Sequence, residues 1–486
     1  SVSKQGEYMY LTSNFEPRRV LDRFEDICAI PHGSGHEQAL GDWILKLANR
    51  YGREAVRDDA GNILVRIPAT PGCEQVAPIL LQGHLDMVLA QEPGLDRDMV
   101  HEPIHLVLDG SILRADRTTL GADNAVGLCN MLALMDADDL RYPPMELLFT
   151  TREETGLQGI QAFDMSQIRS RRMINMDMGD PDCMVIGSAG NAKFDLTRRC
   201  DHTSCYSDVL KIDIAGLRGG HGGLLAGKNH VSALHIAGRI LCDLCDQQSI
   251  RLVRMESSPS NIPSYAALWI SVPDKAAAEG LLEKITQRLR AEMFEETNLS
   301  ITVTAAKADS AASVEDTRAL ADLLLLIPYD VSIRNTQHPE WVLASALLSP
   351  AAYQDGQFTG TLVIRANRDE YFESISLHLS TLCRMTGVTA NMRGKWIPAW
   401  PETTDTPLQI ACRNTFHRLF GGEMLQEVEH GTVEVSVIAK AIPDMDIVGF
   451  APRSRGAHTP KEYLCLDTVE PFWKHLTALL ADLCDQ

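Results

Sequence analysis

The sequence lacks the features that mark membrane, secreted and nucleic-acid-binding proteins. No stretch of the 486 residues approaches about 18 uninterrupted apolar residues, which excludes a membrane-spanning helix. The N-terminal segment has no apolar core of the kind that defines a signal peptide. Asp and Glu outnumber Lys and Arg by 65 to 45, and the net charge of −20 argues against a broad nucleic-acid surface. We therefore expect a cytoplasmic protein that binds neither membranes nor nucleic acids.

Paired cysteines are also scarce. The 12 cysteines are scattered, and the C-x-x-C pattern occurs once, at Cys242–Cys245 in a predicted helix. Because this pattern has no second pair of ligands, it does not match a structural zinc site. We expect reduced, mostly buried thiols, as is usual for cytosolic proteins.

The length predicts two or three domains. Up to residue 195, apolar strands alternate with amphipathic helices, which is typical of an α/β domain with a mainly parallel sheet. Strands and helices of residues 196–395 indicate a separate α+β unit, large enough for two similar halves. Residues 396–407 are rich in Pro and Thr and predict a linker. We therefore predict a first domain of residues 1–195, an insertion of residues 196–395, and completion of the first domain by residues 396–486.

One motif match is misleading. Residues 101–105, HEPIH, fit the H-E-x-x-H pattern of zinc proteases, which places two His one helical turn apart. Pro103 lies inside the motif, removes a helical hydrogen-bond donor and clashes with the preceding turn. We predict that His101 and His105 do not bind a metal.

Side chains that suit a metal follow the predicted strands of the α/β domain. They are His84 and Asp86, Asp123, Glu153 and Glu154, Asp177, and His458. Taken singly, each has an ordinary explanation, such as helix capping for Asp123 or a solvated loop for His458. Together they lie at the carboxyl ends of strands or in the following turns, where an open α/β sheet collects its active site.

This set of residue types favours two divalent metals. Nitrogen and oxygen ligands without thiolates fit catalytic zinc with positions open for water. Consecutive residues at a strand end point in opposite directions, so Glu153 and Glu154 are expected to differ in role. One would be a ligand and the other a general base. The residues alone leave open which is which.

The motifs QGHLDMV, TLGADNAVG, TREETG, INMD and GAHTPKE, in this order, resemble the metal-site motifs of the dizinc aminoacylase/carboxypeptidase-type exopeptidases. The similarity is greatest to the Xaa-His dipeptidase branch and spans nearly the whole chain. It implies a mixed α/β sheet with flanking helices, interrupted by an inserted α+β lid domain. It implies these roles: His84 and Asp177 on one zinc, Glu154 and His458 on the other, Asp123 as the bridge, Glu153 as general base, and Asp86 orienting His84.

The resemblance also suggests residues outside the metal site. GLRGGHGG is similar to the lid segment whose histidine contacts the reacting carbonyl, which implies His221. By the same resemblance Asn261 aids substrate binding, Arg365 receives the substrate carboxylate and Glu434 is an acid of the pocket. Arg368 lies near Arg365, and a structural salt bridge is the alternative reading. The segment after His221 is shorter than usual, and HGTVEVS lacks the usual cysteine, so the departures concern the substrate pocket.

We therefore expect a metal-dependent dipeptidase that acts on Xaa-His and other unblocked dipeptides with two Zn²⁺, for which Mn²⁺ or Co²⁺ could substitute. An N-acyl amino acid deacylase or a tripeptidase on the same scaffold is the alternative. A non-catalytic binding protein would lack Glu153 or one of the ligands, and all of these residues are present. A phosphoesterase would need a phosphate-binding loop, which the motif loops do not clearly supply. A homodimer is possible but is not required for catalysis, because His221 could act within its own chain.

Overall fold

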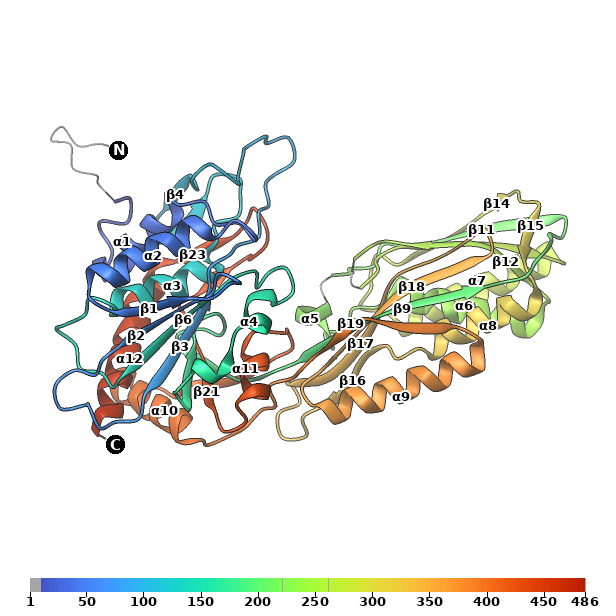
Figure 1. The fold of residues 1–486 in the computed structure, drawn as a ribbon. Coiled ribbons are helices and arrows are strands. Elements are labelled where there is room, and N and C mark those ends of the chain that lie inside the picture. The colour runs from blue at the N-terminus through green and yellow to red at the C-terminus, as the bar shows by residue number, and fades with distance from the viewer. Residues whose placement is uncertain (1–9, 221, 261, 486) are drawn as a thin grey trace. The chain divides into compact units, whose positions relative to one another are not determined.

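The computed structural model describes residues 10–220, 222–260 and 262–485, and the chain divides into two units (Figure 1). Unit 1 comprises Ser1–Gly187, Glu402–Val428 and Val433–Gln486. Unit 2 comprises Ser188–Pro401 and Glu429–Thr432. Unit 2 includes the whole of strand β9 (Gly190–Arg199), through which the predicted boundary at residue 195 passes.

The main sheet of unit 1 has parallel strands at its centre and antiparallel strands toward its edges. In spatial order the strands are β1 (Glu54–Arg57), β2 (Ile63–Ile67), β6 (Met145–Thr150), β3 (Ile79–His84), β7 (Arg172–Asn175), β21 (Asp446–Gly449), β8 (Cys183–Ser188) and β20 (Leu425–Glu429). The chain leaves β3, adds β6 on one side and then β7 on the other. The connections therefore diverge next to β3, which makes its carboxyl end the expected place for a ligand.

Helices cover this sheet and bring further residues to the same edge. They are α1 (Arg18–Cys28), α2 (Gln38–Arg50), α3 (Ala122–Leu134), α4 (Gln158–Ala162), α10 (Pro407–Phe420), α11 (Val435–Ala441) and α12 (Val469–Asp482). Helix α3 is buried along almost its whole length and lies very close to the sheet. A Cβ atom on Gly127 would lie 2.6 Å from the main-chain oxygen of Met176, so only glycine fits there.

A second, smaller sheet of unit 1 runs in the order β22 (Ser454–Arg455), β23 (Tyr463–Cys465), β5 (Ile112–Ala115) and β4 (Leu106–Asp109). Strands β4 and β5 form the hairpin that Asp109-Gly110 predicts, with Gly110 in the left-handed region at φ 61°. Residues 101–105 form no helix, so His101 and His105 are not one helical turn apart as the zinc protease pattern requires.

Unit 2 is built on a long antiparallel sheet. In spatial order its strands are β14 (Ser300–Ala306), β11 (Asp208–Ala215), β13 (Ala266–Val272), β12 (Arg251–Ser257), β17 (Val342–Gln354), β18 (Gln357–Ala366), β9 and β19 (Thr389–Ile397), with β16 (Asp330–Arg334) beside β17. Strands β10 (His202–Ser204) and β15 (Ser310–Ala312) pair with each other. The helices are α5 (Gly222–Leu225), α6 (Ala233–Gln247), α7 (Lys275–Glu292), α8 (Val314–Leu326) and α9 (Asp369–Thr386).

The apolar core of unit 2 lies between this sheet and helices α6 to α9. Leu196, Leu362 and Ile364 point into the core, and each is fully buried. Because neighbouring residues of a strand point to opposite faces, Lys193, Val363 and Arg365 lie on the other face of the sheet. That face is exposed or half-buried at these positions.

Two further features bear on the expectations from sequence. Cys73 and Cys484 form a disulfide with their Cα atoms 5.3 Å apart, so the expectation of reduced thiols is wrong for this pair. The two residues lie 411 positions apart, and neither belongs to a recognisable motif. Within the part of the chain that the structure describes, no helix has both the length and the apolar character needed to cross a bilayer.

Candidate metal centre

The first group of the site forms where β3 and β7 end. His84 is the last residue of β3 and is fully buried. Its Nε2 lies 2.9 Å from Oδ1 of Asp123 and 3.2 Å from Oδ1 of Asp177. Its Nδ1 lies 2.9 Å from the main-chain oxygen of Asp86. Because a carbonyl only accepts, Nδ1 carries the hydrogen; Nε2 donates to the two carboxylates when it is protonated, and offers its lone pair to a cation when it is not.

The second group forms on the other oxygen of Asp123. Oδ2 of Asp123 lies 3.3 Å from Nε2 of His458, which lies 2.8 Å from Oε1 of Glu154. His458 has a left-handed backbone at φ 65° in the turn between β22 and β23, and about half of its side chain is exposed. Asp123 stands at the first turn of α3, between the two imidazoles. A single carboxylate thus connects two sets of ligand-type atoms.

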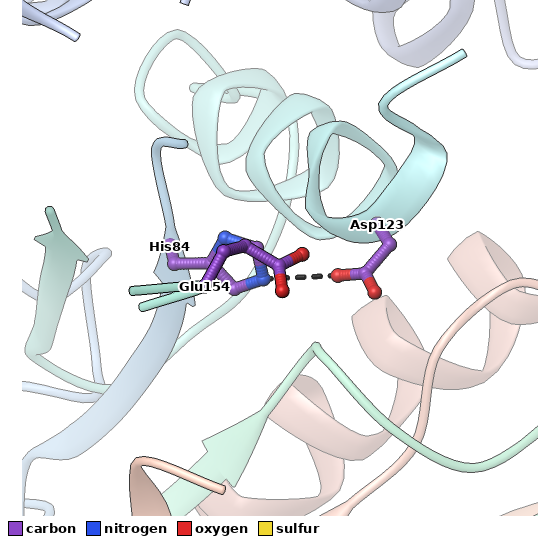
Figure 2. Close-up of side chains that lie close together, drawn as sticks. All are labelled: His84, Asp123 and Glu154. Atoms are coloured by element: carbon purple, nitrogen blue, oxygen red, sulfur yellow. Dashed lines mark hydrogen bonds and ion pairs between the residues drawn. The ribbon is translucent and has the colours of Figure 1, made fainter. Parts of the chain in front are cut away.

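The arrangement of these atoms suits coordination of a metal better than hydrogen bonding among the side chains. One ligand atom from each of His84, Asp123 and Glu154 can be chosen so that all three lie within 4.8 Å (Figure 2). Oε1 of Glu154 and Oδ1 of Asp177 are buried and make no hydrogen bond among the described residues, although an imidazole nitrogen is near each. Nitrogen and carboxylate ligands without thiolates are the set that suits catalytic zinc or a similar divalent cation.

Asp86 organises the loop that carries the two glutamates. Its Oδ1 accepts the backbone N–H of Glu153 at 2.9 Å, and its Oδ2 accepts that of Glu154 at 3.2 Å. The hydroxyl of Ser34 donates to Oδ2 at 2.7 Å. Oδ1 is 3.5 Å from Nδ1 of His84, so His84 is fixed mainly by the main-chain oxygen of Asp86. The carboxylate also fixes the position of the Glu153-Glu154 backbone.

Glu462 plays the corresponding part for the loop that carries Asp123. Its buried carboxylate accepts the backbone N–H groups of Leu120, Gly121 and Asp123 at 2.8, 2.9 and 3.1 Å. The sequence motifs did not point to a role for Glu462, although it is the last residue of the GAHTPKE motif. The signal was weak because the contact joins residues 339 positions apart.

A buried chain of hydrogen bonds lies beneath these ligand-type residues. The backbone N–H of Asp177 donates to Oδ1 of Asn175 at 2.9 Å, and Nδ2 of Asn175 donates to Oε1 of Gln82 at 2.6 Å. Gln82 and Thr150 both donate to Oε2 of Glu434 at the start of α11. The sequence motifs did not single out Asn175 and Gln82. Each lies two residues before a ligand-type residue, and Gln82 shares the strand face of His84 on β3.

Burial and crowding shift the pKa values of the carboxyls in this cluster. Burial raises the pKa of Glu153 well above its usual value, and nearby carboxylates raise it further. Burial likewise raises the pKa of Asp177 to about 7 and that of Glu434 to about 8. Hydrogen bonds to Asp123 and Glu154 raise the pKa of His458 to about 10. Like charges held this close repel each other unless protons or cations offset them.

The residues expected to contact substrate are described to different extents. His221 and Asn261 lie outside the described residues. Glu434 is 1% exposed, and its Oε1 makes no hydrogen bond among the described residues. Arg365 lies on β18 in unit 2, where Nη1 is 3.5 Å from the main-chain oxygen of His430. No carboxylate of the described residues forms an ion pair with Arg365, and burial lowers its pKa.

Comparison with known proteins identifies the family. The model of peptidase family M20/M25/M40 matches residues 80–482. The chain belongs to this peptidase family. It is 29% identical over 482 residues to the cytosol non-specific dipeptidase of Escherichia coli (strain K12), covering 97% of this chain and 99% of the relative.

Solved structures agree in fold. The aminoacylhistidine dipeptidase of Vibrio alginolyticus superposes with a TM-score of 0.89 at 26% identity, over 97% of each chain. A tripeptidase of Staphylococcus aureus, 13% identical, gives a TM-score of 0.59 over 97% of this chain and all of that one, which concerns the fold alone. The prediction of a peptidase with a mixed α/β fold is therefore confirmed.

Proposed function

We propose that the chain is a metal-dependent dipeptidase that cleaves unblocked dipeptides, Xaa-His among them, at a centre of two divalent cations. The observation that carries this proposal is the position of Asp123, whose two oxygens face two separate His-carboxylate sets. His84 and Asp177 would hold one cation, and His458 and Glu154 the other. Zn²⁺ is the cation that the donor set suits best, with Mn²⁺ or Co²⁺ as substitutes.

Two bound cations would supply Lewis acidity for the scissile carbonyl and the attacking water. Glu153 takes the proton of that water and later gives it to the leaving amine, as a general base and then a general acid. Its neighbour Glu154 is a ligand, so the two adjacent carboxylates do different work. Asp86 supports this division, because its carboxylate binds both backbone N–H groups and thereby fixes where each side chain starts. The resemblance assigns His221 to the oxyanion that forms at the carbonyl carbon.

The two ends of a dipeptide are a carboxylate and an ammonium. Arg365 is proposed for the carboxylate, since a guanidinium that is desolvated and has no carboxylate partner among the described residues is suited to an anionic ligand. Glu434 is proposed for the ammonium, since its Oε1 is buried without a hydrogen-bond partner among the described residues and its carboxyl is close enough to His84 and Asp177 to feel their charges. An acid at this place favours a dipeptidase over a deacylase, whose substrate has no free amine.

The deciding experiment is hydrolysis of a small panel: Gly-His, β-Ala-His, Ala-Leu, a tripeptide and an N-acetyl amino acid. Each is assayed with protein stripped of metal by a chelator and again after addition of Zn²⁺. We expect metal-restored cleavage of the dipeptides alone. Cleavage of only the acetylated substrate would establish a deacylase, cleavage of only the tripeptide would establish a tripeptidase, and no cleavage with metal would overturn the proposal.

Location and assembly are proposed on narrower grounds. A cytoplasmic location rests on the name of the Escherichia coli relative, a cytosol dipeptidase. Dimerisation is not required by the proposed chemistry, and sedimentation of the purified protein distinguishes a monomer from a homodimer.

A further inference from the structure

The exposed face of the unit 2 sheet carries a cavity of about 340 Å³ that is cationic in an otherwise acidic protein. Lys193, Arg365 and Arg393 line it, together with small polar and apolar residues, and no Asp or Glu is among its lining residues. The chain as a whole has a net charge of −20. A local surplus of positive charge of this kind attracts anionic ligands.

The three cations are not equivalent. Arg393 is paired with Asp195: its Nε is 3.1 Å from Oδ2, and a second contact joins Nη2 to Oδ1. Arg365 is assigned above to the main-chain carboxylate of the substrate. Lys193 is exposed and forms no ion pair among the described residues. The positive charge of Lys193 is therefore left for a second anion.

Sheet register places Lys193 next to Arg365. Lys193 on β9 is opposite Val363 on β18, and Arg365 is two residues further along β18. All three point to the same face, and diagonal neighbours of this kind are within reach of long side chains. A ligand whose first carboxylate binds Arg365 would thus place a second carboxylate, a few bonds away, close to Lys193.

We propose that Lys193 forms a second anion subsite beside Arg365, which makes dipeptides with a C-terminal Glu or Asp preferred substrates. This inference rests on the proposed function, because it takes Arg365 as the receptor of the main-chain carboxylate. The side-chain carboxylate of the C-terminal residue meets the Lys193 ammonium, whereas the neutral amide of Gln or Asn gains no charge interaction there. The contact is partly solvated, so the preference is modest and sensitive to salt.

The test compares kcat/KM for Ala-Glu and Ala-Gln, which differ only in that charge, with the Zn²⁺-loaded enzyme. We expect a ratio of about three to five in favour of Ala-Glu at low salt, shrinking toward one at high salt. Lys193→Gln should abolish the preference, and Lys193→Glu should invert it. Lys284→Gln is the matched control, because Lys284 is an exposed lysine on α7, a helix that packs against the opposite face of the same sheet.

A ratio near one in the unaltered enzyme, or a ratio that Lys193→Gln leaves unchanged, would overturn the subsite. Failure of the proposed function looks different, because neither Ala-Glu nor Ala-Gln would then be cleaved. A binding measurement on Glu153→Gln, with Ala-Glu and Ala-Gln as titrants, gives the same comparison without turnover. Equal affinity for the two peptides in that variant would also overturn the inference.

Discussion

The carboxylate of Asp86 accepts the backbone N–H of Glu153 at 2.9 Å. Its second oxygen accepts the N–H of Glu154, so one buried side chain fixes the backbone of both adjacent glutamates. Backbone donors gathered around one carboxylate stabilise its ionised form. This arrangement fixes the backbone of the turn after β6 from which both side chains begin.

Replacement of Asp86 by Asn should therefore disturb the glutamates. The amide can accept at only one position, and its NH₂ group would face the N–H of Glu153 or Glu154. We expect kcat/KM to fall about 10- to 100-fold. Steady-state kinetics with the best dipeptide of the panel provides the measurement.

The control is Glu146→Gln. Glu146 is also buried on β6 and accepts the backbone N–H groups of Arg169 and Ser170, but it lies five positions before residue 151, toward the start of the strand. Its loss should lower stability and leave kcat/KM nearly unchanged. Equal losses of activity in the two variants would show that Asp86 acts only through general stability.

The division of labour between the two glutamates gives a second prediction. Glu153→Gln should keep its metal and lose about 10²- to 10⁴-fold in kcat, the range ascribed to a general base. Glu154→Gln should lose metal during dialysis, because Oε1 of Glu154 is the oxygen that lies against His458. Metal content by elemental analysis, measured beside kcat, separates the two. Retained metal in Glu154→Gln with lost metal in Glu153→Gln would reverse the assignment.

The buried chain of hydrogen bonds beneath the proposed ligands gives a third prediction. Asn175→Ala removes the acceptor for the N–H of Asp177 and the donor to Gln82, so we expect metal affinity to fall about 10- to 100-fold. Competition with a chelator of known affinity measures it. Unsatisfied buried groups should also cost about 1–3 kcal/mol of folding stability.

Asn130→Ala separates the two effects. Asn130 is as buried as Asn175 and donates to the main-chain oxygen of Val126 within α3, and among the described residues its side chain makes no hydrogen bond to Asp177 or to Gln82. We expect a similar loss of stability with unchanged metal affinity. If both variants lost metal to the same degree, Asn175 would have no particular part in positioning Asp177.

Patterns in the sequence predict most residues of the candidate site, but few of the hydrogen bonds that hold those residues in place. Strand ends in a parallel sheet converge on one edge, so the sequence could predict that His84 and Asp177 lie together. It could not predict that the Asp86 carboxylate turns to the backbone of residues 153 and 154, because both are far along the chain.

The same limit applies to the other contacts that were missed. Glu462 and Asp123 are 339 positions apart, and Cys73 and Cys484 are 411 positions apart. Periodicity and motif spacing describe neighbours along the chain, whereas these pairs meet only because the C-terminal segment packs back onto the first part of unit 1. The Asp109-Gly110 hairpin shows the converse, since its signal lies entirely within the turn.

The fourth prediction concerns stability against acid and depends on His475. This residue is fully buried on α12 against Phe416 and Phe450, and its Nε2 lies 3.0 Å from the main-chain oxygen of Cys412. Nε2 therefore carries the hydrogen, and Nδ1 has no partner among the described residues. A second proton would enter an apolar site without an acceptor, and burial accordingly lowers the pKa of His475 to about 4.

An unfolded histidine has a pKa near 6.5, so the unfolded chain takes up a proton at pH values where folded His475 stays neutral. The contribution of His475 to stability should thus fall as pH falls from about 6.5 toward about 4, by about 2 kcal/mol between about pH 7 and about pH 5. His475→Gln keeps a donor for the carbonyl of Cys412 without the titration, so its stability should drop less over that interval. His105→Gln, at an exposed position, should drop as the unaltered protein does. Urea unfolding at the two pH values measures each difference, and an equal drop in all three proteins would mean that His475 is not the group responsible.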